Sequence, residues 1–122
     1  MTTRKNLGMG LDALLTSVEG GSTRKRQTST VEQARTWFDQ ALREEDGGNV
    51  FEAYHLYRRV IEALEPSGEP DMSLRTLASR ALNNAAVILA EYEMAETARG
   101  FLKRALEVNP ENTTARDNLE LI

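Results

Sequence analysis

Cysteine is absent from this sequence of 122 residues, and histidine occurs only once, as His55. The absence of cysteine excludes disulfides, thiolate metal sites and cysteine nucleophiles. A single histidine leaves too little material for a histidine-based metal site or for the acid–base relay of a hydrolytic triad. We therefore expect no catalytic residue, no metal site and no cofactor site, and we predict that the protein is not an enzyme.

Long apolar runs are missing as well. No segment approaches the roughly 18 consecutive apolar residues that a transmembrane helix needs. Near the N-terminus the longest unbroken apolar run covers residues 13–15, which is too short for the hydrophobic region of a signal peptide. Together with the lack of cysteine, these absences predict a cytoplasmic protein without a membrane span.

The charges are unevenly distributed along the chain. Residues 1–30 hold five basic and two acidic side chains and residues 31–122 hold ten and seventeen, which gives net charges of +3 and −7. A basic segment beside an acidic domain favours contact with an anionic surface, although a solvated tail is the simpler alternative. The acidic domain, and the lack of aromatic residues near the cations at positions 24–26, argue against a nucleic-acid partner.

Composition divides the chain at about residue 30. Residues 1–29 are rich in glycine, serine and threonine and contain no aromatic side chain, so we expect a flexible basic N-terminal segment. Within it, Leu11, Leu14, Leu15 and Val18 have the spacing of one helix face. This spacing predicts a recognition peptide over residues 7–18 that becomes helical on a partner surface. Residues 30–122 show helical periodicity throughout and form the predicted all-α domain.

Five helices are expected in this domain, and no strand. Thr30 and Gln33 form a capping box, which places the first helix at residues 31–45. Turn and breaker residues separate it from further helices at residues 50–64, 72–92, 95–108 and 113–121. The side chains expected to be buried where these helices touch are Trp37, Ala41, Ala53, Tyr57, Leu82, Ala86, Ala98, Leu102 and Ala105.

Residues 79–112 form a unit of 34 residues with an ordered pattern of small and large side chains. Alanine occupies places 8, 20 and 27, large apolar residues occupy places 4, 11 and 24, and proline occupies place 32. Small side chains let two antiparallel helices approach closely, and proline ends the second helix. The residues of the pattern are Leu82, Ala85, Ala86, Leu89, Ala98, Leu102, Ala105 and Pro110. The unit resembles a tetratricopeptide repeat.

A looser copy of the repeat begins at Ala34, and residues 113–122 begin a third, so the resemblance covers residues 30–122 with about two and a half repeats. The first copy has Trp37, Ala41, Gly48, Ala53, Tyr57 and Val60 at places 4, 8, 15, 20, 24 and 27. The two copies start 45 residues apart, so eleven surplus residues belong to a loop and a helix extension within residues 65–78. An ordinary helical bundle with alanine-rich contacts is the alternative.

The resemblance implies a groove, because tetratricopeptide repeats are scaffolds that bind proteins and peptides on the first helix of each repeat. The groove positions of the family are occupied here by Arg35, Phe38, Leu42, Arg80, Asn83 and Val87. This mixture of apolar and cationic side chains suits an amphipathic helix or a short extended peptide.

Residues 6–15, with the sequence NLGMGLDALL, resemble the extreme N-terminus of ParB-type chromosome-partition proteins. In that family a basic tail with a leucine–glycine pattern engages a ParA-type ATPase. The resemblance assigns partner contacts to Leu7, Gly8, Met9, Gly10, Leu11, Leu14 and Leu15. Met9 stands where the family commonly has a cation between the two glycines, so the resemblance implies docking and leaves stimulation of ATP hydrolysis open.

These patterns predict a protein–protein interaction adaptor with a tetratricopeptide-type groove and an N-terminal docking peptide. Two alternatives remain open at this stage. One is a regulator or localisation partner of a ParA- or MinD-type ATPase. The other is a self-assembling structural protein, since an incomplete third repeat leaves apolar side chains at the end of the stack.

Overall fold

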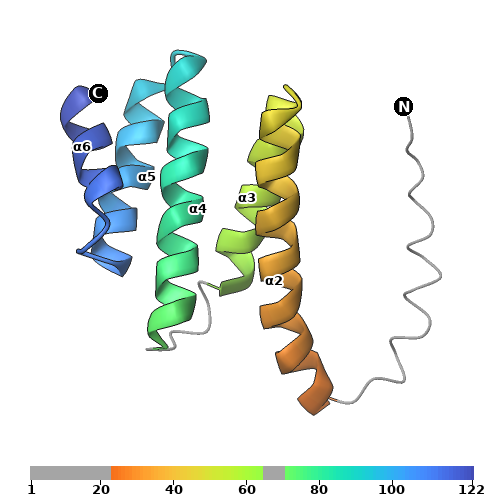
Figure 1. Cartoon of the computed structure of the whole chain (residues 1–122). Helices are drawn as coiled ribbons and strands as arrows, with labels where there is room; N and C mark the ends of the chain where they lie inside the picture. The colour runs from red at the N-terminus through yellow and green to blue at the C-terminus, as the bar shows by residue number, and fades with distance from the viewer. Residues whose placement is uncertain (1–22, 65–70) are drawn as a thin grey trace. The chain divides into compact units, whose positions relative to one another are not determined.

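The computed structural model describes residues 23–64 and 71–122, and side chains from residue 30 onward (Figure 1). The described residues form five α-helices and no strand, which confirms the predicted all-α class. The helices are α2 (Thr23–Asp46), α3 (Val50–Leu64), α4 (Met72–Glu91), α5 (Ala95–Val108) and α6 (Thr113–Leu121). Val31–Ile122 is one compact unit. The predicted recognition peptide at residues 7–18 lies outside the described residues.

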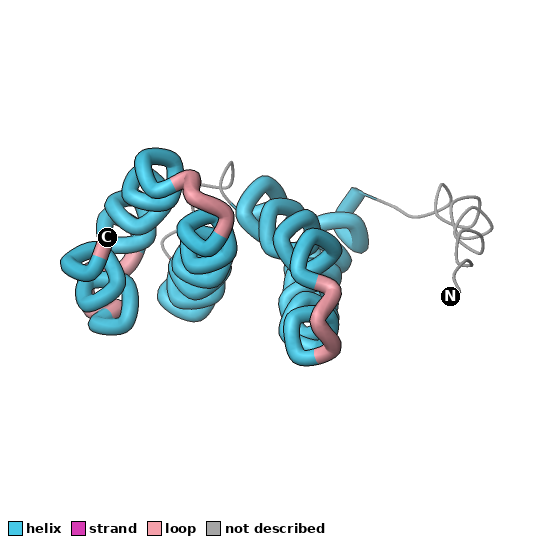
Figure 2. Tube along the Cα trace, turned by 90° about the horizontal axis from the view of Figure 1, so that it is seen from above, coloured by secondary structure: helices cyan, strands magenta, loops and turns pink. Residues whose placement is uncertain are grey.

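Consecutive helices of this unit pack as antiparallel neighbours, and tight turns join α2 to α3 and α4 to α5 (Figure 2). Contacts join α3 to α4, α4 to α5 and α5 to α6, and α6 also touches α4. The described part of α2 packs on α3, since the rings of Phe38 and Tyr57 meet edge to face with their centroids 5.7 Å apart. Each helix therefore buries one side against the helix beside it in sequence.

The core lies where the small side chains let these helices approach. Eight of the nine side chains predicted to be buried are at most 2% exposed: Ala41, Ala53, Tyr57, Leu82, Ala86, Ala98, Leu102 and Ala105. The ninth, Trp37, is only half-buried, and the guanidinium of Arg59 lies over its ring at 5.3 Å. Trp37 packs against the edge of the core, and the apolar stem of Arg59 lies beside its ring in place of a core side chain.

Helix α2 begins at Thr23, eight residues before the predicted start at Val31. The capping box of Thr30 and Gln33 is therefore wrong as a helix start, because both residues lie inside the helix. Residues 23–30 contain no glycine or proline, and arginine, lysine and glutamine at positions 24–27 are good helix formers. Helix α2 thus extends into residues 23–29 of the segment that composition predicted to be a flexible basic N-terminal segment.

The other helix boundaries follow the prediction closely. Helix α4 begins at Met72 behind an Asp71 cap, whose side chain accepts a hydrogen bond from the amide of Ser73 at 2.8 Å. The start at Met72 lies seven residues before Ser79, so the first turns of α4 form the helix extension that the spacing of the two copies required. Helix α4 ends at Glu91, one residue earlier than predicted.

The turn between α2 and α3 and the turn between α4 and α5 have the same hydrogen bonds. In each, one amide donates to the carbonyl three residues back, and the next amide donates to the carbonyl five residues back. The four bonds join Gly48 N to Glu45 O (3.1 Å), Asn49 N to Glu44 O (2.8 Å), Glu93 N to Ala90 O (3.1 Å) and Met94 N to Leu89 O (3.0 Å). Gly48 and Glu93 both have positive φ, at 88° and 62°. Helices α2 and α4 therefore end in the same type of left-handed turn.

We predict opposite stability changes for substitutions at these two turn positions. Gly48→Ala forces a side chain into the left-handed region and should destabilise the domain by about 0.5–1 kcal/mol after the unfolded-state gain is counted. Glu93→Gly relieves the strain of the left-handed backbone at position 93 and should stabilise the domain by a smaller amount, because glycine also increases the entropy of the unfolded chain. Urea unfolding followed by circular dichroism measures both.

Gly100→Ala is the matched control for these variants, because Gly100 lies within α5 and an added Cβ there meets nothing within 4 Å. Alanine should stabilise that helix position by about 0.5–1 kcal/mol. If Gly48→Ala stabilised the domain as Gly100→Ala does, the left-handed turn would not constrain position 48.

A buried serine ties α6 to the helices before it. The hydroxyl of Ser79, which is fully buried, donates to the carbonyl of Ala105 at 2.8 Å and accepts from Nδ2 of Asn112 at 2.8 Å. The other side-chain atom of Asn112, Oδ1, caps α6 by accepting from the amide of Ala115 at 3.0 Å. Every polar atom of this small cluster is thus satisfied, as a buried site requires.

Candidate functional site

The predicted groove residues lie on two helices that the fold brings together. The guanidinium carbon of Arg80 on α4 lies 4.9 Å from the centre of the Phe38 ring on α2, a cation–π contact. Helices α2 and α4 are the first helices of their pairs, and α6 contacts α4 through the hydrogen bond from Nδ2 of Asn118 to Oδ1 of Asn83 at 2.9 Å. We refer to the exposed sides of α2 and α4 at Arg35, Leu42, Arg80 and Val87 as the A-helix face.

The six predicted groove residues differ in how much of their side chains they expose. Arg35 and Arg80 are exposed, and Leu42 and Val87 are half-buried. Phe38 and Asn83 are 3% and 6% exposed, so the structure leaves almost none of either side chain for a ligand to contact. Phe38 packs beneath Arg80 and against Tyr57, which removes its apolar ring from water.

Polar side chains link the helices beneath this face. The hydroxyl of Tyr57 on α3 donates to Oε1 of Glu45 on α2 at 2.7 Å. On α4, Nδ2 of Asn83 donates to Oδ1 of Asn84 at 3.2 Å, and Asn83 in turn accepts from Asn118 on α6. The two links between helices could not be predicted from the sequence, because their partners are 12 and 35 residues apart. The two adjacent asparagines within an alanine- and leucine-rich helix were the available signal.

Tyr57 is the buried titratable group of this region. Burial, followed by the hydrogen bond to Glu45 and the negative charge of that carboxylate, raises the pKa of the Tyr57 hydroxyl far above its ordinary value. Hydrogen bonding with Asn84 and the charge of Arg80 oppose this rise in pKa and do not cancel it. The hydroxyl therefore stays protonated and acts as a donor that joins α3 to α2.

The domain should lose stability at high pH because of Tyr57. An unfolded tyrosine ionises near pH 10, whereas folded Tyr57 keeps its proton, so the unfolded state binds fewer protons above that pH. The stabilising effect is complete below about pH 10 and falls by up to about 1.4 kcal/mol for each pH unit above it. Urea unfolding between pH 8 and 11 measures the slope. Tyr57→Phe should remove this part of the slope, and an identical slope in both proteins would contradict the assignment.

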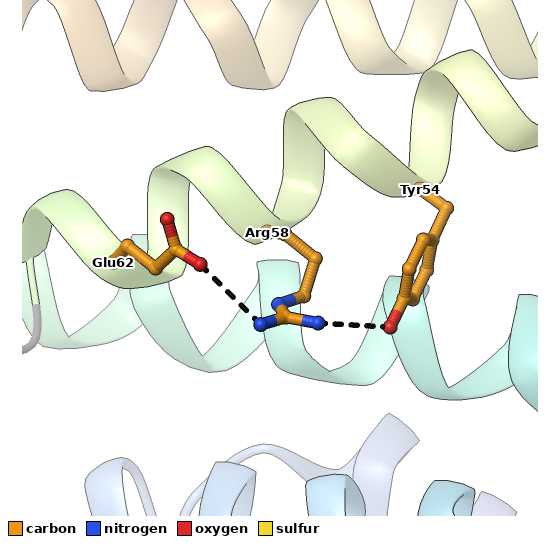
Figure 3. Close-up of polar contacts among 3 residues, drawn as sticks. All are labelled: Tyr54, Arg58 and Glu62. Atoms are coloured by element: carbon orange, nitrogen blue, oxygen red, sulfur yellow. Dashed lines mark hydrogen bonds and ion pairs between the residues drawn. The ribbon is translucent and has the colours of Figure 1, made fainter.

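A second polar row lies along α3 (Figure 3). Arg58 donates from Nη1 to the hydroxyl of Tyr54 at 3.2 Å and from Nη2 to Oε2 of Glu62 at 3.3 Å. The three side chains are four residues apart, so they follow one side of the helix. The hydrogen bond that Arg58 donates to Tyr54 is the main cause that raises the pKa of Arg58, which is charged in any case. This exposed row is a small helix-stabilising feature and supplies no reactive group.

The described residues offer neither a metal-binding cluster nor a membrane-spanning helix. No group of three or more histidine, cysteine, aspartate or glutamate side chains among them is arranged to hold a metal ion. None of the helices in residues 23–64 and 71–122 is long and apolar enough to cross a membrane. The A-helix face is the candidate site, because it combines exposed cations with half-buried apolar side chains.

The described residues form an all-α domain whose five helices pack in adjacent antiparallel pairs. No protein-family model, no curated protein and no solved structure matches the chain. Inference about function consequently depends on the residues and contacts of this chain.

Proposed function

We propose that this protein is a cytoplasmic, non-enzymatic adaptor built from tetratricopeptide-type repeats, and that it binds a peptide segment of another protein on its A-helix face. The observation that carries the proposal is the agreement between the two copies. Four pairs of equivalent residues are each 0% exposed: Ala41 and Ala86, Ala53 and Ala98, Tyr57 and Leu102, and Val60 and Ala105. The matching left-handed turns at Gly48 and Glu93 support the same register.

The chemistry of the A-helix face suggests what it binds. Arg35 and Arg80 offer exposed cations, and the half-buried Leu42 and Val87 offer apolar contacts beside them. Such a combination suits a segment with apolar side chains on one side and carboxylates on the other, either as an amphipathic helix or as a short extended peptide. Phe38 supports Arg80 from below and contributes to binding by holding that guanidinium in place.

The N-terminal peptide is the second docking element of the proposal, and it lies outside the described residues. Its resemblance to the ParB N-terminus favours a ParA- or MinD-type ATPase as the partner, which makes a regulator of such an ATPase the second candidate function. Each fully buried leucine adds about 1.5–3 kcal/mol, and folding of the peptide takes back a few kcal/mol, so about micromolar binding is expected.

A set of matched variants tests which element binds. The tagged full-length chain is used to capture partners from its native cells, and the captured proteins are identified by mass spectrometry. Arg35→Glu/Arg80→Glu reverses the charge of the A-helix face, and Arg75→Glu/Lys103→Glu makes the same charge change at exposed positions elsewhere. Leu11→Asp/Leu14→Asp disables the N-terminal peptide.

The outcomes separate the candidates. Loss of a partner with the A-helix face variant, but not with its control, supports the adaptor function. Loss of an ATPase with the Leu11/Leu14 variant supports the ATPase regulator. If every variant retained the partners of the parent, neither element would be a recognition site. Growth of particle mass with concentration in light scattering would favour the self-assembling alternative, for which Leu121 at 83% exposure is an available contact.

A further inference from the structure

An exposed aromatic pair lies where the two turns of the repeat meet. Phe51, at the start of α3, and Tyr92, at the end of α4, are 63% and 48% exposed, and their ring centroids are 5.0 Å apart. Met94, two residues further on, is 48% exposed. Figure 1 shows the start of α3 and the α4–α5 turn at the same end of the helices. Three of the five large hydrophobic side chains that are exposed among the described residues thus belong to these two turns.

The fold does not need these side chains. They lie outside the buried core, and the turn geometry comes from backbone hydrogen bonds that any residue at positions 51, 92 and 94 would permit. Exposed apolar side chains scattered singly are ordinary on a protein surface, but a contiguous group of them marks an interaction site. The contact between the Phe51 and Tyr92 rings makes these two side chains contiguous, and Met94 is exposed two residues beyond Tyr92.

The sequence on either side of the aromatic pair is acidic, with Arg43 and Arg99 at the borders of the acidic stretches. Residues 44–54 and 90–98, which include both turns, contain seven acidic side chains and no lysine or arginine. Four of these acids are exposed and make no side-chain hydrogen bond or ion pair with another described residue: Asp46, Glu52, Glu91 and Glu93. We call the three apolar side chains and these four carboxylates the turn-end patch.

We propose that the turn-end patch is a docking surface for a basic segment of another protein, in which arginine side chains flank apolar ones. A guanidinium stacks on aromatic faces such as those of Phe51 and Tyr92, and its charge is attracted by the surrounding carboxylates. The apolar part of an arginine or lysine side chain also covers hydrophobic surface while its head stays among the acids. The A-helix face presents Arg35 and Arg80, so the two surfaces select partner segments of opposite charge.

A designed peptide tests this proposal on the full-length chain. The probe is a labelled synthetic peptide of about 15 residues, with leucine at helical spacing on one face and arginine on the other, and its binding is followed by fluorescence anisotropy at about 0.15 M salt. The Phe51→Ser/Tyr92→Ser variant should weaken binding by about tenfold or more. Met72→Ser/Leu121→Ser, which alters equally exposed apolar residues elsewhere, should change it by less than about twofold.

A second pair of variants tests the charges independently and does not depend on the aromatic residues. Glu91→Gln/Glu93→Gln should weaken binding by about threefold to tenfold and reduce its salt dependence, whereas Glu111→Gln/Glu120→Gln should leave both nearly unchanged. Equal losses in the patch variants and their controls would mean that the peptide binds the acidic domain diffusely, and this would overturn the proposal. Failure of the parent chain to bind the peptide would overturn it as well.

Discussion

Ala86→Glu should unfold the domain under conditions in which the parent protein is folded. Ala86 is 0% exposed on α4, within the core that α4 forms with its neighbours. Placing an unpaired carboxylate there should cost about 3 kcal/mol or more, which in a domain of this size lowers the melting temperature by roughly 12 °C or more. Thermal unfolding followed by circular dichroism measures the change.

Ala95→Glu is the control for this experiment. Ala95 is exposed at the first position of α5, where a negative charge is compatible with the helix dipole, so the melting temperature should stay within a few degrees of the parent value. An unchanged melting temperature for Ala86→Glu would refute the register of the second repeat. A similar loss in both variants would mean that the added charge, and not its burial, causes the effect.

Deletion of residues 113–122 should destabilise the protein and promote aggregation. Helix α6 buries Ala115 completely and Leu119 and Ile122 partly against the helices before it. Its removal exposes the apolar side of that core and leaves the buried amide of Asn83 without its Asn118 donor. We expect a loss of roughly 2–4 kcal/mol and larger particles in size-exclusion chromatography with light scattering.

Point substitutions give the same test without shortening the chain. Leu119→Asp/Ile122→Asp should reproduce the loss of stability, because both side chains are packed on the core. Leu121→Asp should not, since Leu121 is 83% exposed. A truncated chain that remained monomeric, with the unfolding midpoint of the parent, would show that α6 does not protect the end of the stack.

The helical repeat was predictable because its signal is local and periodic. Small alanine side chains mark the positions where one helix can approach the next. All the alanines predicted at such contacts, which lie on α2, α3, α4 and α5, are buried. The predicted helix start at Val31, with Thr30 as its cap, was wrong. A capping box depends on two side chains, whereas the helix-forming residues at positions 24–27 favour the helical backbone over a whole turn. Caps consequently locate helix ends less reliably than periodicity locates helix faces.

The site was predictable only in part. The spacing of the repeat placed Arg35, Arg80, Leu42 and Val87 on neighbouring helices, but it did not reveal that Phe38 is covered. That outcome depends on Tyr57 and Arg80, which approach Phe38 from two other helices. The turn-end patch escaped the same reasoning, because Phe51 and Tyr92 belong to different helix pairs and meet only in the folded domain.

The hydrogen bond between Asn118 and the buried Asn83 has a consequence for the spacing of the recognition side chains. If α6 slid along α4 by one helical turn, about 5.4 Å, the buried amide would face apolar atoms and lose its partner. The pair therefore fixes the register of α6 against α4, as single buried polar residues do in coiled coils. The side chains of α4 and α6 thus stay at fixed heights along the two helices, so a partner bound across both helices as proposed would need its anchor residues at one fixed separation.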